Sequence, residues 1–430
     1  MTRLIYFFYS FLCFVILGSC GNENLIYPRK QYQINTPRDA YWAALDSTGL
    51  SQTLMVKNWQ KAAQLALADS VKIATPFREI GYFQADAPQA IAYQLDLKTG
   101  ERLDIRLSTQ PDSVLFFVDL FRLKPTDSTT YLQHLISAED YKTDSLAYEA
   151  QDDGTYLLRL QPELLATCKF TIELVSQPAY GAFPVEGKDN TDIWSSFGDP
   201  RDGGRRTHKG IDIFARRGTP VVAAVDGRIR SVRDTGLGGK QVWLYDQLRR
   251  QSLYYAHLDQ QLVEKDQIVQ AGDTLGTVGN TGNARFTPPH LHFGIYRRGY
   301  GAIDPKPFVA YRSKRMPRVN ADLGAIGQMA RIRLPKVSLR KAPQRRAPVQ
   351  ATLEENLPVE IIAGNKYWYR VRNSIGLTGY LQAGEVESLE QALSIQTTLN
   401  AQPLLQHPSE WASPLQEIPK GSSIEVLGIS

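Results

Sequence analysis

The stretch Pro288-Pro289-His290-Leu291-His292-Phe293-Gly294-Ile295-Tyr296 alternates polar and apolar side chains and is rich in aromatic and branched residues. This pattern, entered from a proline-rich loop, predicts a β-strand. Side chains two positions apart on a strand share one face, about 6.5–7 Å apart along it. We therefore expect His290 and His292 to serve one site, and Leu291 and Phe293 to point into the core.

A second segment, His208-Lys209-Gly210-Ile211-Asp212, offers another imidazole and a carboxylate. On a straight strand His208 and Asp212 would be about 13 Å apart, which is too far to share an ion. Residues 210–214 have the pattern of a strand, so we expect His208 to lie before it, after a bend that Gly210 favours. Two imidazoles and one carboxylate leave a fourth coordination position open, as in catalytic zinc sites.

A further histidine, His257, lies in Tyr254-Tyr255-Ala256-His257-Leu258, so that four of the six histidines fall between 208 and 292. Histidine is the commonest protein metal ligand and also titrates near neutral pH. Metal ligation and proton transfer are therefore the functions to test. His134 and His407 have no such neighbours, and we interpret them as structural.

These segments resemble the catalytic domain of the lysostaphin-like (LytM-type) zinc metalloendopeptidases, which carry His-x-x-x-Asp, Tyr-x-His-Leu and His-Leu-His-Phe in this order. The resemblance extends from Phe197-Gly198-Asp199-Pro200-Arg201 to Tyr296. The connecting phrases also match, namely Gly218-Thr219-Pro220-Val221, Ala224-Val225-Asp226-Gly227, Ala271-Gly272-Asp273 and Gly279-Asn280-Thr281-Gly282.

The resemblance implies one Zn²⁺ ion bound by His208, Asp212 and His292, with His257 and His290 as the catalytic pair. One imidazole takes the proton of the water and one later protonates the leaving amine, in an order that the sequence leaves open. Family members mostly cut peptide cross-links of bacterial peptidoglycan, while some relatives have lost ligands and regulate other wall hydrolases. Since all five residues are present, we expect an active enzyme. An aromatic hydroxyl that assists in some relatives is not assigned to a residue.

The N-terminus has the pattern of an export signal. A basic residue, an apolar run over 4–17 and small residues form a secretory signal whose core is too short to span a membrane. Leu17-Gly18-Ser19-Cys20 also resembles the lipobox of bacterial lipoproteins, which implies cleavage before Cys20 and lipid attachment to it; the alternative is an ordinary signal peptide with an incidental cysteine. We expect an exported protein held by this lipid in the cell envelope, in the periplasm or at the surface. Cys168 then has no disulfide partner and is interpreted as a buried apolar residue.

The fold class that we expect is mainly β, with about three domains in 430 residues. Thr36-Pro37-Arg38-Asp39 predicts the start of a helix that ends at Gly49, and Ser51 is the expected cap of a second helix that runs to about Ser70. Alternating runs then predict an antiparallel β-sandwich. These runs are 90–97, 102–107, 114–123, 156–160 and 170–174.

The central region is all-strand in pattern, and its glycine-rich turns, 236–239 and 279–282, are expected to wall a cleft. The predicted segments are a lipoprotein signal peptide (1–20), a tether (21–35), helices plus a β-sandwich (36–177), a zinc metallopeptidase domain (178–311), a basic linker (312–330), a Src-homology-3-like small β-barrel (331–390) and a partial second repeat (391–430).

The C-terminal part contains an internal repeat. Leu339 and Pro343 recur sixty-five positions later as Leu404 and Pro408, and further apolar positions follow the same offset. The first copy continues through 367–371 and 376–381 and resembles bacterial Src-homology-3-like domains, which often attach to wall hydrolases and bind wall peptides. The second copy stops at Ser430 and lacks roughly its last two strands, so either the sequence is truncated there or another element completes this half-domain. An unfinished sandwich would leave an open apolar edge.

Basic residues are concentrated between 312 and 346, where eleven Lys or Arg and the single acid Asp322 give a formal charge of +10, against +5 for the whole chain. This stretch either binds anionic groups of the wall or outer membrane or forms a solvated linker and strand face. Nucleic acid does not suit an exported chain, and no protein partner is indicated.

Three functions follow from these observations. The first is a zinc endopeptidase of peptidoglycan, attached to the envelope membrane through Cys20. The second is a peptidase for other exported proteins, and the third is a catalytically inactive wall-binding regulator of other hydrolases. For the first, cross-links between D-Ala and diaminopimelate are favoured over polyglycine bridges, because a lipoprotein of a diderm bacterium would meet the former.

Overall fold

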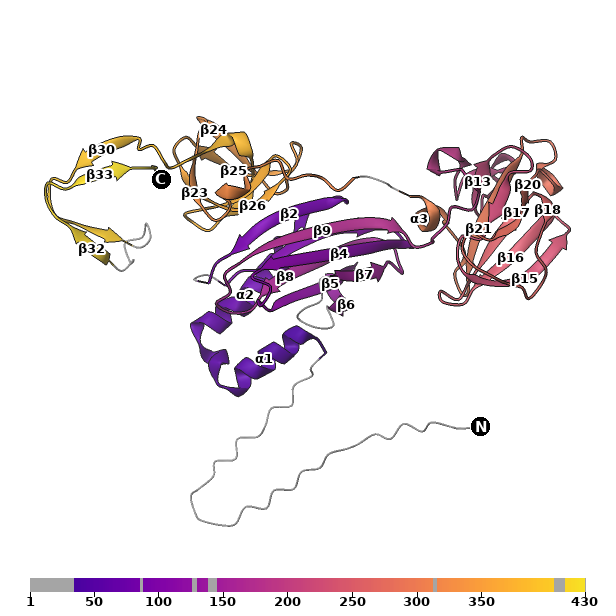
Figure 1. Cartoon of the computed structure of the whole chain (residues 1–430), viewed down its shortest axis with the longest axis horizontal. Coiled ribbons are helices and arrows are strands. Elements are labelled where there is room, and N and C mark those ends of the chain that lie inside the picture. The colour runs from indigo at the N-terminus through magenta and orange to yellow at the C-terminus, as the bar shows by residue number, and fades with distance from the viewer. Residues whose placement is uncertain are drawn as a thin grey trace, which may run out of the picture.

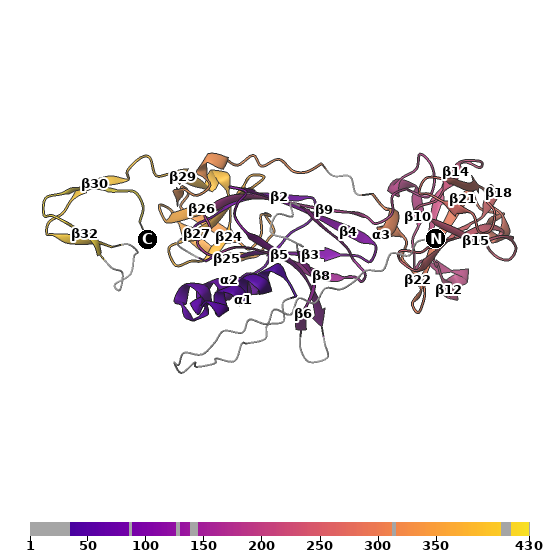
Figure 2. The same cartoon turned by 60° about the horizontal axis from the view of Figure 1, so that its bottom comes forward.

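The computed structural model describes residues 35–85, 88–125, 130–137, 145–311, 315–405 and 414–429. The predicted signal segment, Cys20 and His407 lie outside these ranges. About half of the described residues are in strands and far fewer are in helices, which confirms the mainly β fold class. Within the same ranges, no helix combines the length and the apolar character that a membrane crossing requires. Figures 1 and 2 show a β domain of residues 179–311 at one end, a β-sandwich in the middle and the C-terminal strands at the other end.

The first helix, α1 (Pro37–Ser47), begins as predicted. The Thr36 side chain accepts a hydrogen bond from the Asp39 backbone N–H at 3.0 Å, and Pro37 occupies the first turn. The chain leaves the helix through Gly49, whose φ of 78° lies in the left-handed region.

The cap predicted for the second helix was wrong. Helix α2 (Leu54–Ala68) is capped by Thr53, whose hydroxyl accepts from the Val56 N–H at 3.4 Å. Ser51 cannot take this role because it lies in a short 3-10 turn and its hydroxyl donates to the Asp46 carboxylate.

The β-sandwich consists of two sheets that enclose one core. All five predicted runs are strands, and the structure adds β1 (Val71–Lys72), β2 (Phe77–Phe83), β6 (Thr130–Ser137) and β7 (Ser145–Glu149), which were not predicted from the sequence. One sheet has the order β1-β3-β8-β5-β6, in which β1 is parallel to β3. Its strands are β1 (Val71–Lys72), β3 (Ile91–Leu97), β8 (Gly154–Pro162), β5 (Phe116–Pro125) and β6 (Thr130–Ser137).

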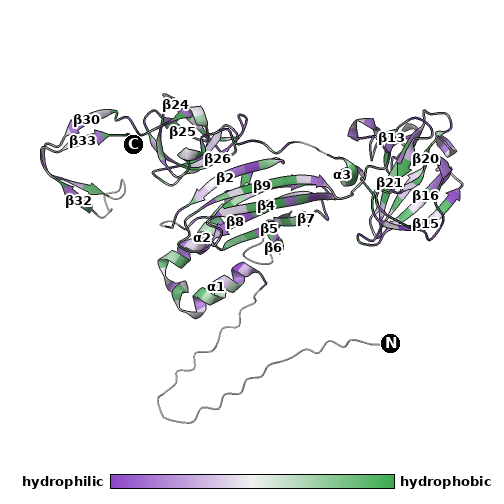
Figure 3. Cartoon of the chain, in the orientation of Figure 1, coloured by the Kyte–Doolittle hydropathy of each residue, from purple (hydrophilic) through white to green (hydrophobic). Residues whose placement is uncertain are grey.

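The other sandwich sheet contains β2 (Phe77–Phe83), β9 (Cys168–Pro178), β4 (Glu101–Gln110) and β7 (Ser145–Glu149) in this order. Hydrophilic and hydrophobic residues alternate along these strands (Figure 3), as expected where one face of a sheet packs on a core. Phe83 stacks on Phe170 in this core. Cys168 is buried beside them, as predicted, and burial raises the pKa of its thiol to about 11.

Residues 179–311 form a second core between a large antiparallel sheet and a small one. The large sheet has the order β10-β13-β21-β17-β16-β15-β19, with β22 beside β21, and the small sheet has the order β14-β20-β18. Their strands are β10 (Ile193–Ser195), β13 (Ile211–Phe214), β21 (His290–Arg297), β17 (Gln251–Ala256), β16 (Lys240–Asp246), β15 (Gly227–Asp234), β19 (Ile268–Val269), β22 (Gly301–Ile303), β14 (Pro220–Val222), β20 (Thr274–Val278) and β18 (Leu258–Gln261). A two-stranded pair, β11 (Pro200–Arg201) and β12 (Arg206–Thr207), and helix α3 (Lys306–Val309) complete it.

The Src-homology-3-like region is not a closed barrel in the described residues. Its strands run in the order β25-β24-β28-β27-β26, and β26 then pairs with β2 of the sandwich through Ala363 and Gly364. A Cβ at Gly81 of β2 would overlap the Phe170 ring of β9 and lie 3.2 Å from the Ala363 Cβ of β26, so glycine permits close packing on both sides. The strands are β23 (Met329–Ile332), β24 (Lys336–Arg340), β25 (Val349–Glu354), β26 (Pro358–Asn365), β27 (Trp368–Asn373), β28 (Thr378–Gln382) and β29 (Val386–Ser388).

The partial repeat forms two separate strand pairs that extend from this region (Figure 1). Ile395 and Leu415 are exposed on them, and Leu399 is exposed between them, in agreement with an open apolar edge. Arg331 holds the base of this arm, because its Nη1 donates to the carbonyls of Gln391 and Leu427 at 2.8 and 3.0 Å. The strands are β30 (Ser394–Thr397), β33 (Ser423–Val426), β31 (Gln402–Leu405) and β32 (Pro414–Ile418).

Polar contacts join the domain of residues 179–311 to the sandwich. Arg249 donates from Nε and Nη2 to the two carboxylate oxygens of Glu149, at 2.7 and 2.8 Å. Such a bidentate pair fixes orientation as well as distance. Phe308 of α3 lies directly against Gly100, where no Cβ could be accommodated.

A buried carboxylate joins the sandwich to the C-terminal region. Glu79 of β2 is fully buried and accepts from the Tyr93 hydroxyl at 2.6 Å and the Tyr380 hydroxyl at 2.7 Å. The Arg370 guanidinium lies 3.6 Å from the same carboxylate. Since Tyr380 and Arg370 belong to β28 and β27, this cluster crosses the junction made by the sheet.

Candidate functional site

Strand register places the candidate ligands side by side. In the antiparallel pair β13–β21, Asp212 lies opposite His292, and Phe214 lies opposite His290. On the other side of β21, His292 lies opposite Ala256, the residue before His257. As predicted, Leu291 and Phe293 point the other way and are fully buried.

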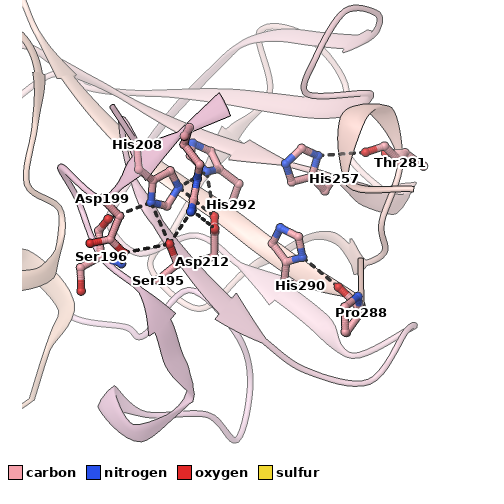
Figure 4. A network of polar contacts seen from close by, with 11 residues as sticks. Ser195, Ser196, Asp199, His208, Asp212, His257, Thr281, Pro288, His290 and His292 are labelled. Carbon is pink, nitrogen blue, oxygen red and sulfur yellow. Dashed lines mark hydrogen bonds and ion pairs between the residues drawn. The ribbon is translucent and has the colours of Figure 1, made fainter. Parts of the chain in front are cut away.

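Three donor atoms meet at one point of this surface (Figure 4). His208 Nε2 lies 3.0 Å from Asp212 Oδ1 and 2.9 Å from His292 Nδ1, and His292 Nδ1 lies 3.0 Å from Asp212 Oδ1. Zinc–ligand bonds of about 2.0–2.2 Å in a tetrahedron separate ligand atoms by about 3.3 Å, so a single ion fits these donors. The predicted set of His208, Asp212 and His292 is thus brought together.

Gly210 is needed because of close packing at this point. A bend at Gly210 before β13 was predicted from the sequence, and the bend is present. The stronger constraint is that a Cβ at Gly210 would overlap the Phe293 carbonyl oxygen and lie 2.9 Å from the His292 ring. A side chain at this position would therefore displace one of the ligands.

The loop 195–199 supports the His208 imidazole from outside. His208 Nδ1 lies 2.9 Å from the Ser196 carbonyl oxygen, which can only accept, so Nδ1 carries the hydrogen and Nε2 presents a lone pair. Asp199 braces this loop by accepting from the Ser196 N–H at 2.7 Å. The His208 N–H in turn donates to the Asp199 carbonyl at 2.8 Å.

The carboxylate of Asp212 is held as an anion. Burial alone would raise the pKa of Asp212, but hydrogen bonds with His208 and His292 outweigh it and hold the pKa well below its usual range. Arg201 donates to the second carboxylate oxygen, Oδ2, at 2.7 Å. One oxygen thus faces the imidazoles while the other is oriented by a guanidinium.

His257 occupies a strained position between the two sheets. It follows β17 and precedes β18 with a φ of 64°, which is uncommon for a residue other than glycine and typical of functional sites. Its Nδ1 lies 2.9 Å from the Thr281 carbonyl oxygen, so Nε2 is the free lone pair. Burial, together with the charges of His290 and His292, lowers the pKa of His257 to about 4.

His290 is held in an equivalent way from the other side. Its Nδ1 lies 2.9 Å from the Pro288 carbonyl oxygen, and its ring stacks on Phe214. The rings of His257 and His290 are 5.1 Å apart in an edge-to-face arrangement. In both imidazoles Nδ1 is directed to a backbone carbonyl, which leaves Nε2 for the cleft, and Figure 4 shows the two rings together on the same side of His208, Asp212 and His292.

The five residues line an open cleft of about 610 Å³. Every described residue that lines it comes from positions 195–296, so neither the sandwich nor the C-terminal strands form its walls. Leu237 and Gly238 of one glycine-rich loop, and Asn283 and Ala284 next to the other, lie along it, in agreement with the predicted role of these loops.

Several residues of the cleft were not predicted from the sequence to belong to the site. Tyr254 faces it from β17, its ring 5.8 Å from that of His292, and burial raises the pKa of its hydroxyl to about 12. The sequence feature that could have identified Tyr254 is its position three residues before His257. Arg201 lay within a motif that was quoted, but nothing in the spacing connected it with Asp212.

Comparison with known proteins gives two domain assignments. The sequence model of the family described as "Peptidase family M23" matches residues 206–305, and that of the family described as "Bacterial SH3 domain" matches residues 335–387. The L-Ala–D-Glu endopeptidase of Bacillus subtilis is 35% identical over 137 residues, which are 29% of this chain and 42% of that protein. The peptidoglycan DD-endopeptidase ShyC of Vibrio cholerae is 37% identical over 103 residues, which are 23% of this chain and 22% of that protein.

Among solved structures, the catalytic domain of the antimicrobial peptidase lysostaphin from Staphylococcus simulans is 32% identical and covers 30% of this chain and 86% of that one, with a TM-score of 0.23. The chain spans less than half the length of the two curated relatives named above.

Proposed function

Because residues 206–305 form a domain of peptidase family M23 and residues 335–387 a bacterial SH3 domain, we propose that this chain is a zinc metalloendopeptidase that hydrolyses peptide cross-links of bacterial peptidoglycan. The observation that carries the proposal is one geometric arrangement. Ligand atoms of two buried residues, His208 and Asp212, and of the half-buried His292 converge within hydrogen-bonding distance of one another, and two imidazoles with free Nε2 atoms face the same cleft.

His208, Asp212 and His292 would hold the ion, and their chemistry suits zinc, which binds imidazole nitrogen and carboxylate oxygen. Bound there, zinc supplies Lewis-acid polarisation of the scissile carbonyl and acidifies water. The Asp212 carboxylate is already an anion, and the His208 lone pair is already directed to the site. The ligands therefore need little reorganisation.

The two remaining histidines would move the protons. With Nδ1–H donated to a backbone carbonyl, each neutral imidazole can accept a proton at Nε2 and later return it. The low pKa of His257 keeps it neutral at physiological pH. We assign the removal of the water proton and the protonation of the leaving amine to this pair, His257 and His290.

Tyr254 would act as a hydrogen-bond donor in the same cleft. Because its pKa is raised to about 12, the phenol keeps its hydrogen at physiological pH. A donor of this kind stabilises the oxyanion that develops on the attacked carbonyl. Gly238 makes room for this hydroxyl, since a Cβ there would overlap it.

The test is digestion of purified cross-linked sacculi by the full chain without its lipid, with products identified by mass spectrometry. We expect loss of cross-linked dimers that a chelator abolishes and zinc restores. His290→Ala should remove the activity, whereas His134→Ala, a histidine of the sandwich, should not. The relatives are named for different bonds, so the product masses would also identify the bond that this chain cuts, where we favour D-Ala–diaminopimelate.

Two results would contradict this proposal, and each would indicate a different function. If casein and sacculi were digested equally well, the chain would be a peptidase of broader range. If sacculi remained intact with every sample while the protein still bound them, and a cellular phenotype survived His290→Ala, the chain would be a wall-binding regulator.

We further propose that the protein is exported and anchored in the cell envelope through a lipid on Cys20. The support is the signal-like sequence before this residue. Labelling with a fatty acid tests it directly, because Cys20→Ser should abolish incorporation and release the protein from membranes. Unchanged labelling in that variant would contradict the anchor.

A further inference from the structure

Trp194 presents an indole ring to solvent beside the cleft. The side chain is 70% exposed, yet it is fixed in place. Its Nε1–H donates to the Thr191 carbonyl at 3.2 Å, and its ring stacks on Phe214 with centroids 4.7 Å apart and planes 15° apart. The ring is therefore rigid and open on one face.

Exposure alone would mean little, because single apolar residues are common on protein surfaces. Trp194 differs from other exposed aromatic residues in that its ring is fixed by a second ring. Tyr300, which is 72% exposed, and Phe286, which is 87% exposed, stack on no other ring in the described residues. A flat side chain that is already ordered loses little conformational entropy when a ligand covers it.

A stack of rings connects Trp194 with the catalytic pair. Phe214 lines the cleft and also stacks on His290, with centroids 4.9 Å and planes 23° apart. A phenyl ring has room for one stacked ring on each face, so the indole and the imidazole lie on opposite faces of Phe214. The open face of Trp194 is thus one layer outside the cleft wall, where only a substrate longer than the cleft would reach.

The chemistry of the open face of the Trp194 indole determines which kind of group can bind to it. The only hydrogen-bond donor of the indole is already used by Thr191, so the face offers no further polar contact. It offers an electron-rich flat surface, which attracts the positive edges of C–H groups. Pyranose rings have a face made of axial C–H groups, and a glycan strand places such rings at a distance from the peptide bond that is cut.

We propose that Trp194 is a remote subsite that stacks on a pyranose ring of the glycan strand to which the cross-linked peptide is attached. This proposal rests on the proposed function. It makes the enzyme prefer cross-links that are still part of the wall over free peptides. Apolar area that is buried on the indole face contributes to binding only when the sugar is present.

The experiment compares two substrates with the full chain, intact sacculi and the same cross-linked peptides freed of sugar by an amidase. We expect Trp194→Ala to lower kcat/KM about five- to tenfold on sacculi and less than about twofold on the sugar-free peptides, the size of one aromatic contact. Trp194→Phe should keep most of the activity, and Tyr300→Ala, which removes an exposed ring away from the cleft, should behave as the wild type.

Equal losses on both substrates would overturn the proposal, because Trp194 would then act only through Phe214 and His290. No loss on sacculi would overturn it as well. A wild type that cuts neither substrate would instead contradict the proposed function.

A binding measurement tests the subsite even if the wild type cuts neither substrate. In nitrogen-labelled protein, the indole N–H signal that Trp194→Phe removes should shift on titration with glycan strands stripped of peptide. An unchanged signal would overturn the subsite, whereas a shift in a protein without peptidase activity would support it.

Discussion

The Arg201 guanidinium lies 2.7 Å from Oδ2 of Asp212, on the side of the carboxylate that faces away from His208 and His292. Arg201 comes from β11 and also donates to the Ser195 hydroxyl, so it ties the carboxylate to the loop that supports His208. The contact leaves Oδ1 as the only carboxylate oxygen that faces both imidazoles.

We predict that Arg201→Gln weakens zinc binding about 10- to 100-fold, the usual effect of removing a group that orients a metal ligand. Affinity is measured by competition with a chromophoric chelator. Arg205→Gln is the matched control, because Arg205 is exposed and its guanidinium contacts only the Asp202 carbonyl among the described residues. Equal affinities for the two variants would show that Arg201 does not orient Asp212.

The pH dependence of hydrolysis should reflect His257. Its lowered pKa of about 4 means that the imidazole is neutral above this value and loses its free lone pair as the pH falls through it. We predict that protonation of His257 does not lower kcat on a soluble cross-linked peptide between about pH 7 and about pH 5, and reduces it only near pH 4. A bound cation would lower this pKa further. In nuclear magnetic resonance, a His257 imidazole signal that titrates near pH 6.5, the ordinary value for histidine, would be inconsistent with a buried His257.

Gly210→Ala should damage both the fold and the metal site. The added methyl group overlaps the Phe293 carbonyl and presses on the His292 ring, so we expect a destabilisation of about 1–3 kcal/mol and a loss of zinc affinity. Calorimetry and zinc competition measure the two effects. Gly384→Ala, where the nearest atom would be 4.0 Å away, serves as a control and should change neither.

Acid should destabilise the sandwich through Asp119. Burial would raise the pKa of Asp119, but contacts with His134, Arg159 and Ser137 lower it to about 2. Since the folded pKa is lower than the unfolded value of about 3.9, the stabilisation is complete above pH 4 and is lost as the pH falls towards 2. Asp119→Asn should therefore reduce stability at pH 7 by about 2 kcal/mol. Unfolding curves of both proteins at pH 7 and pH 2.5 should then converge at the lower pH.

The junction at Glu79 should depend on the Tyr380 hydroxyl. Tyr380→Phe removes one of two hydroxyl donors from a fully buried carboxylate, and a hydrogen bond to a charged group contributes about 1.5–3 kcal/mol. We expect the C-terminal region to unfold separately, at a lower temperature, in calorimetry. Tyr367→Phe, an exposed tyrosine of the same region, is the control. A single unchanged transition in Tyr380→Phe would mean that the junction does not depend on this hydroxyl.

Local patterns in the sequence predicted much of this structure. The alternation in 288–296 identified β21 and the common face of its two histidines, because the side-chain period of a strand is a local property. The cap at Thr36 was predicted for the same reason, whereas Ser51 was wrongly assigned because its hydroxyl binds Asp46, a side chain of the preceding turn. Strand β2 was missed, and its partners come from distant parts of the chain.

The sequence alone determined which residues meet at the candidate metal site, since His208, Asp212 and His292 are recognisable from their types, spacing and family motifs. Only the tertiary structure decided what surrounds them. The pairing of β13 with β21 and of β21 with β17 places Tyr254 beside His292 and Phe214 beside His290, the pairing of β10 with β13 brings Trp194 onto Phe214, and Arg201 of β11 contacts Asp212. These contacts depend on which strands are neighbours and in which register, and that choice minimises the free energy of the whole core rather than of any one segment.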